Sequence, residues 1–184
     1  MAERFGGVQM PVKGMGLRDI MAKEKGNILD GWYNLILETY PPESRVFLKK
    51  KSDQFANPIG HTISASIEGI LEGLLCNGAQ EQMAVMLSDI IRIMAIQDCS
   101  PSDTILLILL LKRTLRDTTR GYVKGDQLFS ELLAFEDKID RLTLLSFDIF
   151  MKCREDVFNL KVNELKRSTF MIAKRLKSEG AETL

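Results

Sequence analysis

The C-terminal part of the chain reads DQLFSELLAFEDKIDRLTLLSFDIFMKCREDVFNLKVNELKRSTFMIAKRLK over residues 126–177, with neither proline nor glycine. Along its first half, apolar or small side chains recur in alternating steps of three and four residues. This repeat places them on one face of an α-helix. The stretch therefore predicts one very long helix with one side in a core. The residues of this first stripe are Leu128, Leu132, Phe135, Ile139, Leu142, Ser146, Ile149 and Cys153.

A second apolar stripe begins on the same predicted helix at Leu144, Phe147 and Met151. Two stripes on one helix need two neighbours, and we expect one of them to be a second copy of the chain. Asp148 interrupts this apolar window, and Lys152 follows four residues later, the spacing of an ion pair on a helix edge. A polar contact in a dimer interface or a ligand cavity is the alternative role for Asp148. The candidate interface residues are Leu144, Phe147, Asp148 and Met151.

Beyond this point the predicted helix becomes basic. Its cationic residues outnumber the three acidic ones, Glu155, Asp156 and Glu164. We expect this end to project from the core and to provide a surface for an unidentified regulatory protein partner. Residues 178–184 are expected to form a flexible tail. The basic residues are Lys152, Arg154, Lys161, Lys166, Arg167, Lys174, Arg175 and Lys177.

Upstream of the long helix, capping residues and prolines divide the chain into shorter helical segments. Pro41-Pro42 ends the first segment, because proline cannot continue a helix. Asn57 before Pro58, and Ser100 before Pro101, are typical of helix starts. We expect residues 1–16 to be a flexible N-terminus and residues 17–177 to form one all-α, globin-like bundle of about six helices. The expected helices cover residues 17–40, 43–51, 58–76, 80–97, 101–120 and 126–177.

The segment Ile105–Leu111 is the longest fully apolar run in the chain. A helix that is apolar all round is buried on every side, so we expect this one at the centre of the bundle. The run is far shorter than the roughly 20 residues that a membrane-spanning helix requires. No apolar signal segment opens the chain, so we expect a cytoplasmic protein without a membrane span.

The composition argues against nucleic acid as a partner. The chain has 184 residues, and its 25 Lys and Arg residues balance 25 Asp and Glu residues. A neutral chain lacks the excess of positive charge with which proteins bind phosphate backbones. Cys76, Cys99 and Cys153 are an odd, widely spaced set, typical of reduced thiols rather than a disulfide framework or a zinc site. We therefore expect no metal site.

Catalytic and phosphate-binding motifs such as GxGxxG, GxxxxGK[ST], HExxH and GxSxG are all missing from the sequence. His61 is the single histidine. It lies on the helical face of Glu68 and Glu72, away from the apolar stripe, and a local hydrogen bond in the first helical turn is its simplest interpretation. A role as a haem or small-ligand residue, or as a catalytic base beside a carboxylate, is the alternative. We expect no enzymatic activity and no catalytic residue.

Several segments, in order, resemble the N-terminal domain of the RsbR/RsbRD family of RsbT co-antagonists, the stressosome sensor proteins of bacteria. The resemblance covers about residues 17–170. It is carried by ILDGW at 28–32, ETYP at 38–41, FANPIGHTI at 55–63, DIIRIMAIQD at 89–98, SPS at 100–102, DRL at 140–142, FDI at 147–149 and CRE at 153–155.

This resemblance implies a globin-like helical fold, dimerisation, and a sensory or regulatory role in stress signalling. Family members usually carry a STAS domain after this domain, and the 184 residues contain none, so we expect a stand-alone domain that signals through its own surface. A haem-binding globin needs a histidine on the helix that precedes the last two. Residues 80–97 occupy that place here and have no histidine. The resemblance therefore implies the branch without haem, with His61 as the alternative ligand.

Overall fold

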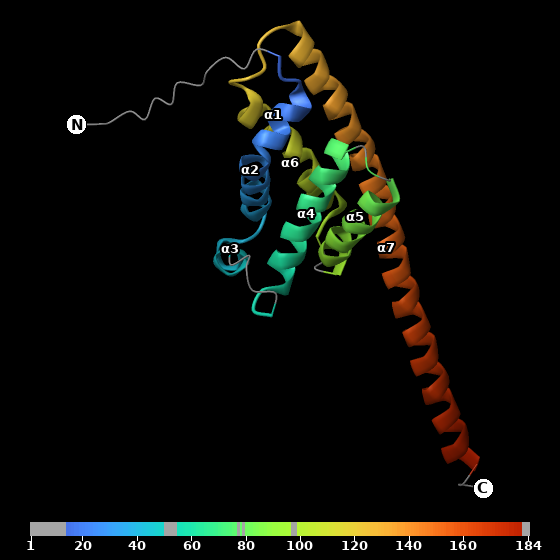
Figure 1. The fold of residues 1–184 in the computed structure, drawn as a ribbon. Coiled ribbons are helices and arrows are strands. Elements are labelled where there is room, and N and C mark those ends of the chain that lie inside the picture. The colour runs from blue at the N-terminus through green and yellow to red at the C-terminus, as the bar shows by residue number, and fades with distance from the viewer. Residues whose placement is uncertain (1–13, 50–54, 77, 79, 97–98, 182–184) are drawn as a thin grey trace.

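A computed structural model describes residues 14–49, 55–76, 78, 80–96 and 99–181 of the chain. Within these ranges the secondary structure consists of seven α-helices and no strand (Figure 1). The all-α prediction and the long C-terminal helix are confirmed. The helices are α1 (Leu17–Lys23), α2 (Lys25–Glu38), α3 (Pro42–Leu48), α4 (Pro58–Cys76), α5 (Gln80–Ile96), α6 (Pro101–Thr119) and α7 (Asp126–Ala181).

The first expected helix is in fact two, which accounts for the seventh element. The helix is interrupted at Glu24, which ends α1 and precedes α2. The break lies just before Gly26-Asn27, where weak helix formers lower the cost of interrupting the helix. Helix α3 ends at Leu48 rather than at residue 51, and residues 50–54 lie outside the described part of the chain.

The two predicted helix starts are confirmed by their hydrogen bonds. The Gly60 amide donates to Asn57 Oδ1 at 2.8 Å at the start of α4. The Asp103 amide donates to Ser100 Oγ at 3.1 Å at the start of α6. Each bond satisfies one of the amides that a helix N-terminus leaves without an internal partner.

The core joins helices that are distant in sequence. Trp32 of α2 is fully buried, and its indole Nε1 donates to the Leu107 carbonyl of α6 at 2.7 Å. Between α4 and α5, small residues allow close packing, since a Cβ added at Gly69 would lie 2.1 Å from Met86 Sδ. The bundle is therefore held by an aromatic side chain with a satisfied polar atom and by a tight contact between two helices.

The expectation that Ile105–Leu111 is buried on every side is wrong. Leu107, Ile108 and Leu111 lie in the core, but Leu106 and Leu109 remain 41% and 37% exposed. Helix α6 packs mainly against α2 and α7, with a smaller contact to α5. In a single copy these neighbours do not surround α6, so one side of the apolar run stays uncovered.

Helix α7 packs along α5 and α6 and then continues beyond the bundle (Figure 1). At 1.5 Å per residue its 56 residues extend about 84 Å. From Arg154 to Lys174 its side chains are exposed, apart from the half-buried Val157 and Val162. The predicted projection of the basic end is thus confirmed. Among the described residues, none of the helices has the length and apolar character needed to cross a membrane.

Candidate functional site

Helices α6 and α7 are held in register by two ion pairs. Arg116 binds Glu136 with both arms of its guanidinium, Nε to Oε1 at 2.7 Å and Nη2 to Oε2 at 2.6 Å. This hydrogen bonding raises the pKa of Arg116. One turn further, Lys112 Nζ lies 2.6 Å from Asp140 Oδ1. The two helices are therefore antiparallel: moving four residues toward the N-terminus of α6 corresponds to moving four residues toward the C-terminus of α7.

Continuing this antiparallel register by one turn brings the uncovered side of α6 to the second apolar stripe of α7. In this register Leu109 lies opposite Thr143 and Leu106 opposite Ser146, each next in sequence to a residue of that stripe, Leu144 and Phe147. The structure leaves Leu144, Phe147 and Met151 exposed by 70%, 47% and 50%. These five residues, Leu106, Leu109, Leu144, Phe147 and Met151, are called the α6/α7 apolar face below. Scattered exposed apolar residues are common on proteins, whereas a contiguous apolar patch marks an interaction surface.

The α7 part of this face coincides with the residues that the sequence indicated, and the α6 part was missed. The continuously apolar run around Leu106 and Leu109 predicts core residues, so it gives no sign that these two stay exposed. The sequence did contain a signal that they share a side of the helix. Leu106 and Leu109 are three residues apart, and residues at that spacing lie on one face of a helix. Asp148 is exposed, so its carboxylate keeps its hydration. The structure shows no ion pair between Asp148 and Lys152 among the described residues, contrary to the predicted pairing.

The apolar stripe of α7 does not stop where the bundle ends. Large apolar residues recur at every seventh position, and those beyond the bundle are exposed. A seven-residue repeat keeps side chains on one line of a helix that coils around a partner helix. Sequence reasoning missed this repeat, although the spacing itself was its signal. Its residues are Leu144, Met151, Phe158, Leu165 and Ile172.

His61 lies in the first turn of α4 and is half-buried. Its backbone amide donates to the Asn57 carbonyl at 3.0 Å. The two carboxylates on its helical face, Glu68 and Glu72, both bind Lys25 Nζ, at 2.9 Å and 2.5 Å. These bonds, with Glu72 first, raise the pKa of Lys25. The described contacts thus join the two acids to α2, and no acid of the described residues pairs with the imidazole.

In the described part of the chain, no three His, Cys, Asp or Glu side chains come together as a metal site would require. What the structure brings together instead is an apolar face on two adjacent helices, bordered by ion pairs and prolonged by a seven-residue repeat. This arrangement is suited to binding another helix surface.

Comparison with known proteins agrees with the resemblance noted in the sequence. No curated protein and no solved structure gives a significant match. The family described as the RsbT co-antagonist protein rsbRD N-terminal domain matches residues 26–165, which include all of α4, α5 and α6 and most of α7. The chain therefore belongs to the RsbT co-antagonist protein rsbRD N-terminal domain family, and it is a regulatory signalling domain.

Proposed function

We propose that this regulatory domain acts as a non-catalytic homodimer, with the α6/α7 apolar face as the contact between the two copies. The exposed stripe Leu144, Phe147 and Met151 is the observation that carries the proposal. Because each copy presents the same face, a two-fold axis would cover both faces at once. Burial of these five residues would remove their apolar surface from water, the main driving force for association.

The seven-residue repeat favours a second copy over an unrelated partner. An identical helix supplies a matching repeat at the same spacing along its whole length. Each bundle lies at one end of its α7 (Figure 1). A parallel pair of α7 helices would therefore set the two bundles side by side and continue the contact along the projecting helices. Their basic surface would remain outside this contact and would serve a regulatory protein partner in the cytoplasm.

Light scattering on the full chain tests the dimer. The wild type should have the mass of two copies, and Leu144→Asp or Phe147→Asp should shift it to one copy, because each places a charge in the apolar contact. Leu160→Asp is the matched control. Leu160 is also 70% exposed on α7, but it lies on the opposite side of the helix from the repeat.

Circular dichroism should show the same helical content for all three variants and the wild type. Two results would contradict the homodimer. One is a wild type of single-copy mass at concentrations well above those in a cell. The other is equal dissociation by Leu144→Asp and Leu160→Asp, which would mean that any charge on α7 has the same effect.

The proposed domain needs no resident cofactor, and its output is a protein contact rather than a reaction. Addition of haem to the purified chain should give no sharp Soret band. A band that disappears in His61→Ala would instead support a haem-binding sensor that uses this histidine.

A further inference from the structure

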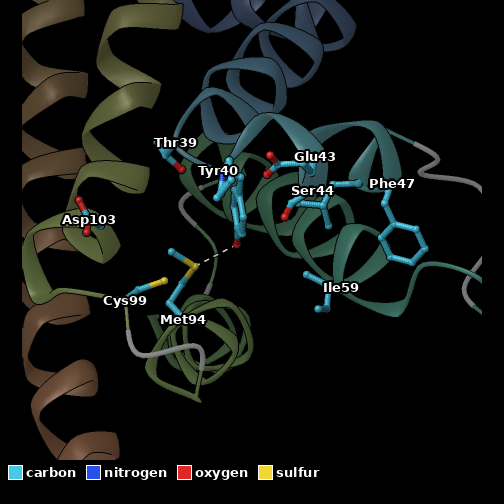
Figure 2. Close-up of a pocket in the computed structure, with 11 residues that line it drawn as sticks. Thr39, Tyr40, Glu43, Ser44, Phe47, Ile59, Met94, Cys99 and Asp103 are labelled. Atoms are coloured by element: carbon cyan, nitrogen blue, oxygen red, sulfur yellow. Dashed lines mark hydrogen bonds between the residues drawn. The ribbon is translucent and has the colours of Figure 1, made fainter.

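A cavity of about 590 Å³ opens between the end of α2, helix α3 and the adjoining ends of α4, α5 and α6. Figure 2 shows Tyr40, Met94 and Cys99 directed toward one another on one side of it, with Phe47 on the other. This volume lies within the range of small-molecule sites, which are mostly apolar with a few placed polar groups. The apolar wall is formed by Pro41, Phe47, Leu48, Ile59 and Met94.

The charged side chains among the described lining residues of the cavity are both acidic. Among the described residues Glu43 and Asp103 line it and no lysine or arginine does; both acids are exposed, and Asp103 Oδ2 accepts from the Ser100 hydroxyl at 2.6 Å. Arg45 of α3 does not line the cavity but lies beside it, since its guanidinium donates to the carbonyls of Tyr40 and Glu38 at 2.7 Å and 2.8 Å. Two carboxylates beside one guanidinium leave an excess of negative charge, which favours a positive ligand group over a negative one.

The Tyr40 hydroxyl is a polar group with a weak partner. It donates to the thioether sulfur of Met94 at 3.1 Å, and a thioether is a poor acceptor. Burial, and to a lesser extent the Cys99 thiol and Tyr33, raise the pKa of Tyr40 to about 12, so the hydroxyl stays protonated at neutral pH. Buried tyrosine hydroxyls usually have a stronger partner, which a ligand atom in the cavity would provide.

We propose that this cavity binds an amphipathic organic cation. Its apolar body would lie against Phe47, Ile59 and Met94, its ammonium group would face Glu43 and Asp103, and a polar atom would meet the Tyr40 hydroxyl. The site is complete in one copy. That its occupancy is the sensed signal rests on the proposed regulatory function, because the cavity includes the first turn of α6, the helix that carries Leu106 and Leu109.

Three probes with one apolar body and different charges test the proposal: 3,3-diphenylpropylamine, 3,3-diphenylpropanol and 3,3-diphenylpropanoate. Calorimetry gives the affinities for the full chain. The methyl resonance of 13C-labelled Met94, assigned with Met94→Leu, reports the location. The amine should shift this resonance and bind about tenfold more tightly than the carboxylate, with the alcohol between them.

Variants separate the parts of the site. The double variant Glu43→Gln with Asp103→Asn should bind the three probes with similar affinity. The control double variant, Glu81→Gln with Asp117→Asn, changes two exposed acids outside the cavity lining and should keep the preference for the amine over the carboxylate. Tyr40→Phe should weaken amine binding about fivefold. Ser44→Trp should fill the cavity and abolish binding of all three probes.

The proposal fails if the carboxylate binds as tightly as the amine, if Ser44→Trp leaves binding intact, or if no probe shifts the Met94 resonance at millimolar concentration. Light scattering on the same samples keeps this result apart from the homodimer. A monomer that binds the amine would contradict the homodimer and leave the site standing. A dimer that binds none of the probes would agree with the homodimer and contradict the proposed ligand site.

Discussion

At the scale of single residues, Asn57 makes the connection between α3 and α4. Its side chain is fully buried. Oδ1 caps α4 through the Gly60 amide, while Nδ2 donates to the carbonyls of Phe47 and Leu48 at 3.2 Å and 3.1 Å. One amide thus satisfies the start of one helix and the end of another. A Cβ at Gly60 would lie 2.2 Å from Asn57 Nδ2, so glycine is needed for this close contact.

Replacement of Asn57 by alanine should lower the free energy of unfolding by about 2 kcal/mol, because it removes a helix cap and the amide donor to the Phe47 carbonyl, while the Leu48 carbonyl keeps the Tyr33 hydroxyl at 2.6 Å. Urea denaturation of the full chain measures this loss. Ser100→Ala, which removes an exposed cap on α6, is the control and should cost about 1 kcal/mol. A smaller loss for Asn57 than for Ser100 would contradict the bridging role.

At the scale of helices, α6 and α7 are joined by an ion pair of unequal exposure. The Glu136 side chain is nearly buried, whereas Arg116 is exposed. The two parallel hydrogen bonds between them keep the carboxylate satisfied where water has little access. Arg113 and Asp117, one turn apart on α6, are both exposed and 3.9 Å apart, which is a weak surface pair.

Arg116→Ala should therefore lower the free energy of unfolding by about 2 kcal/mol, since it removes both charge-assisted bonds to a nearly buried acid. Arg113→Ala, the same substitution three residues away, should change it by less than about 0.5 kcal/mol. Thermal and urea unfolding of the two variants provide the comparison. Equal effects would mean that the burial of Glu136 contributes nothing to the α6–α7 contact.

At the scale of the whole molecule, the bundle and the projecting part of α7 differ in how many of their side chains are buried. The bundle contains the buried residues, while the helix beyond Arg154 has no fully buried side chain up to Lys174. Stability of the single copy should thus reside in the bundle alone, and the projecting helix is available for contacts with other chains.

Shortening the chain after Arg154 tests this division. In the Leu144→Asp background, which removes the proposed dimer contact, the shortened and full-length chains should unfold at the same urea concentration, because the deleted residues are exposed. A lower midpoint for the shortened chain would show that the projecting helix packs on its own bundle. In the wild-type background the shortening should weaken the dimer, through loss of Phe158, Leu165 and Ile172 from the repeat.

The sequence by itself determined the starts of α4 and α6 and the end of α2, because caps and proline breaks act over three or four residues, but it did not determine the break at Glu24 or the end of α3 at Leu48. Asn57-Pro58, Ser100-Pro101 and Pro41-Pro42 are such local signals, and the apolar stripes of α7 follow from helical periodicity. Tertiary structure alone decided which apolar side chains stay uncovered, since burial depends on the neighbours that pack on each face. It left Leu106 and Leu109 exposed and placed them beside the stripe of α7. It also formed the cavity around Tyr40 from the ends of five helices, a juxtaposition that no local spacing encodes.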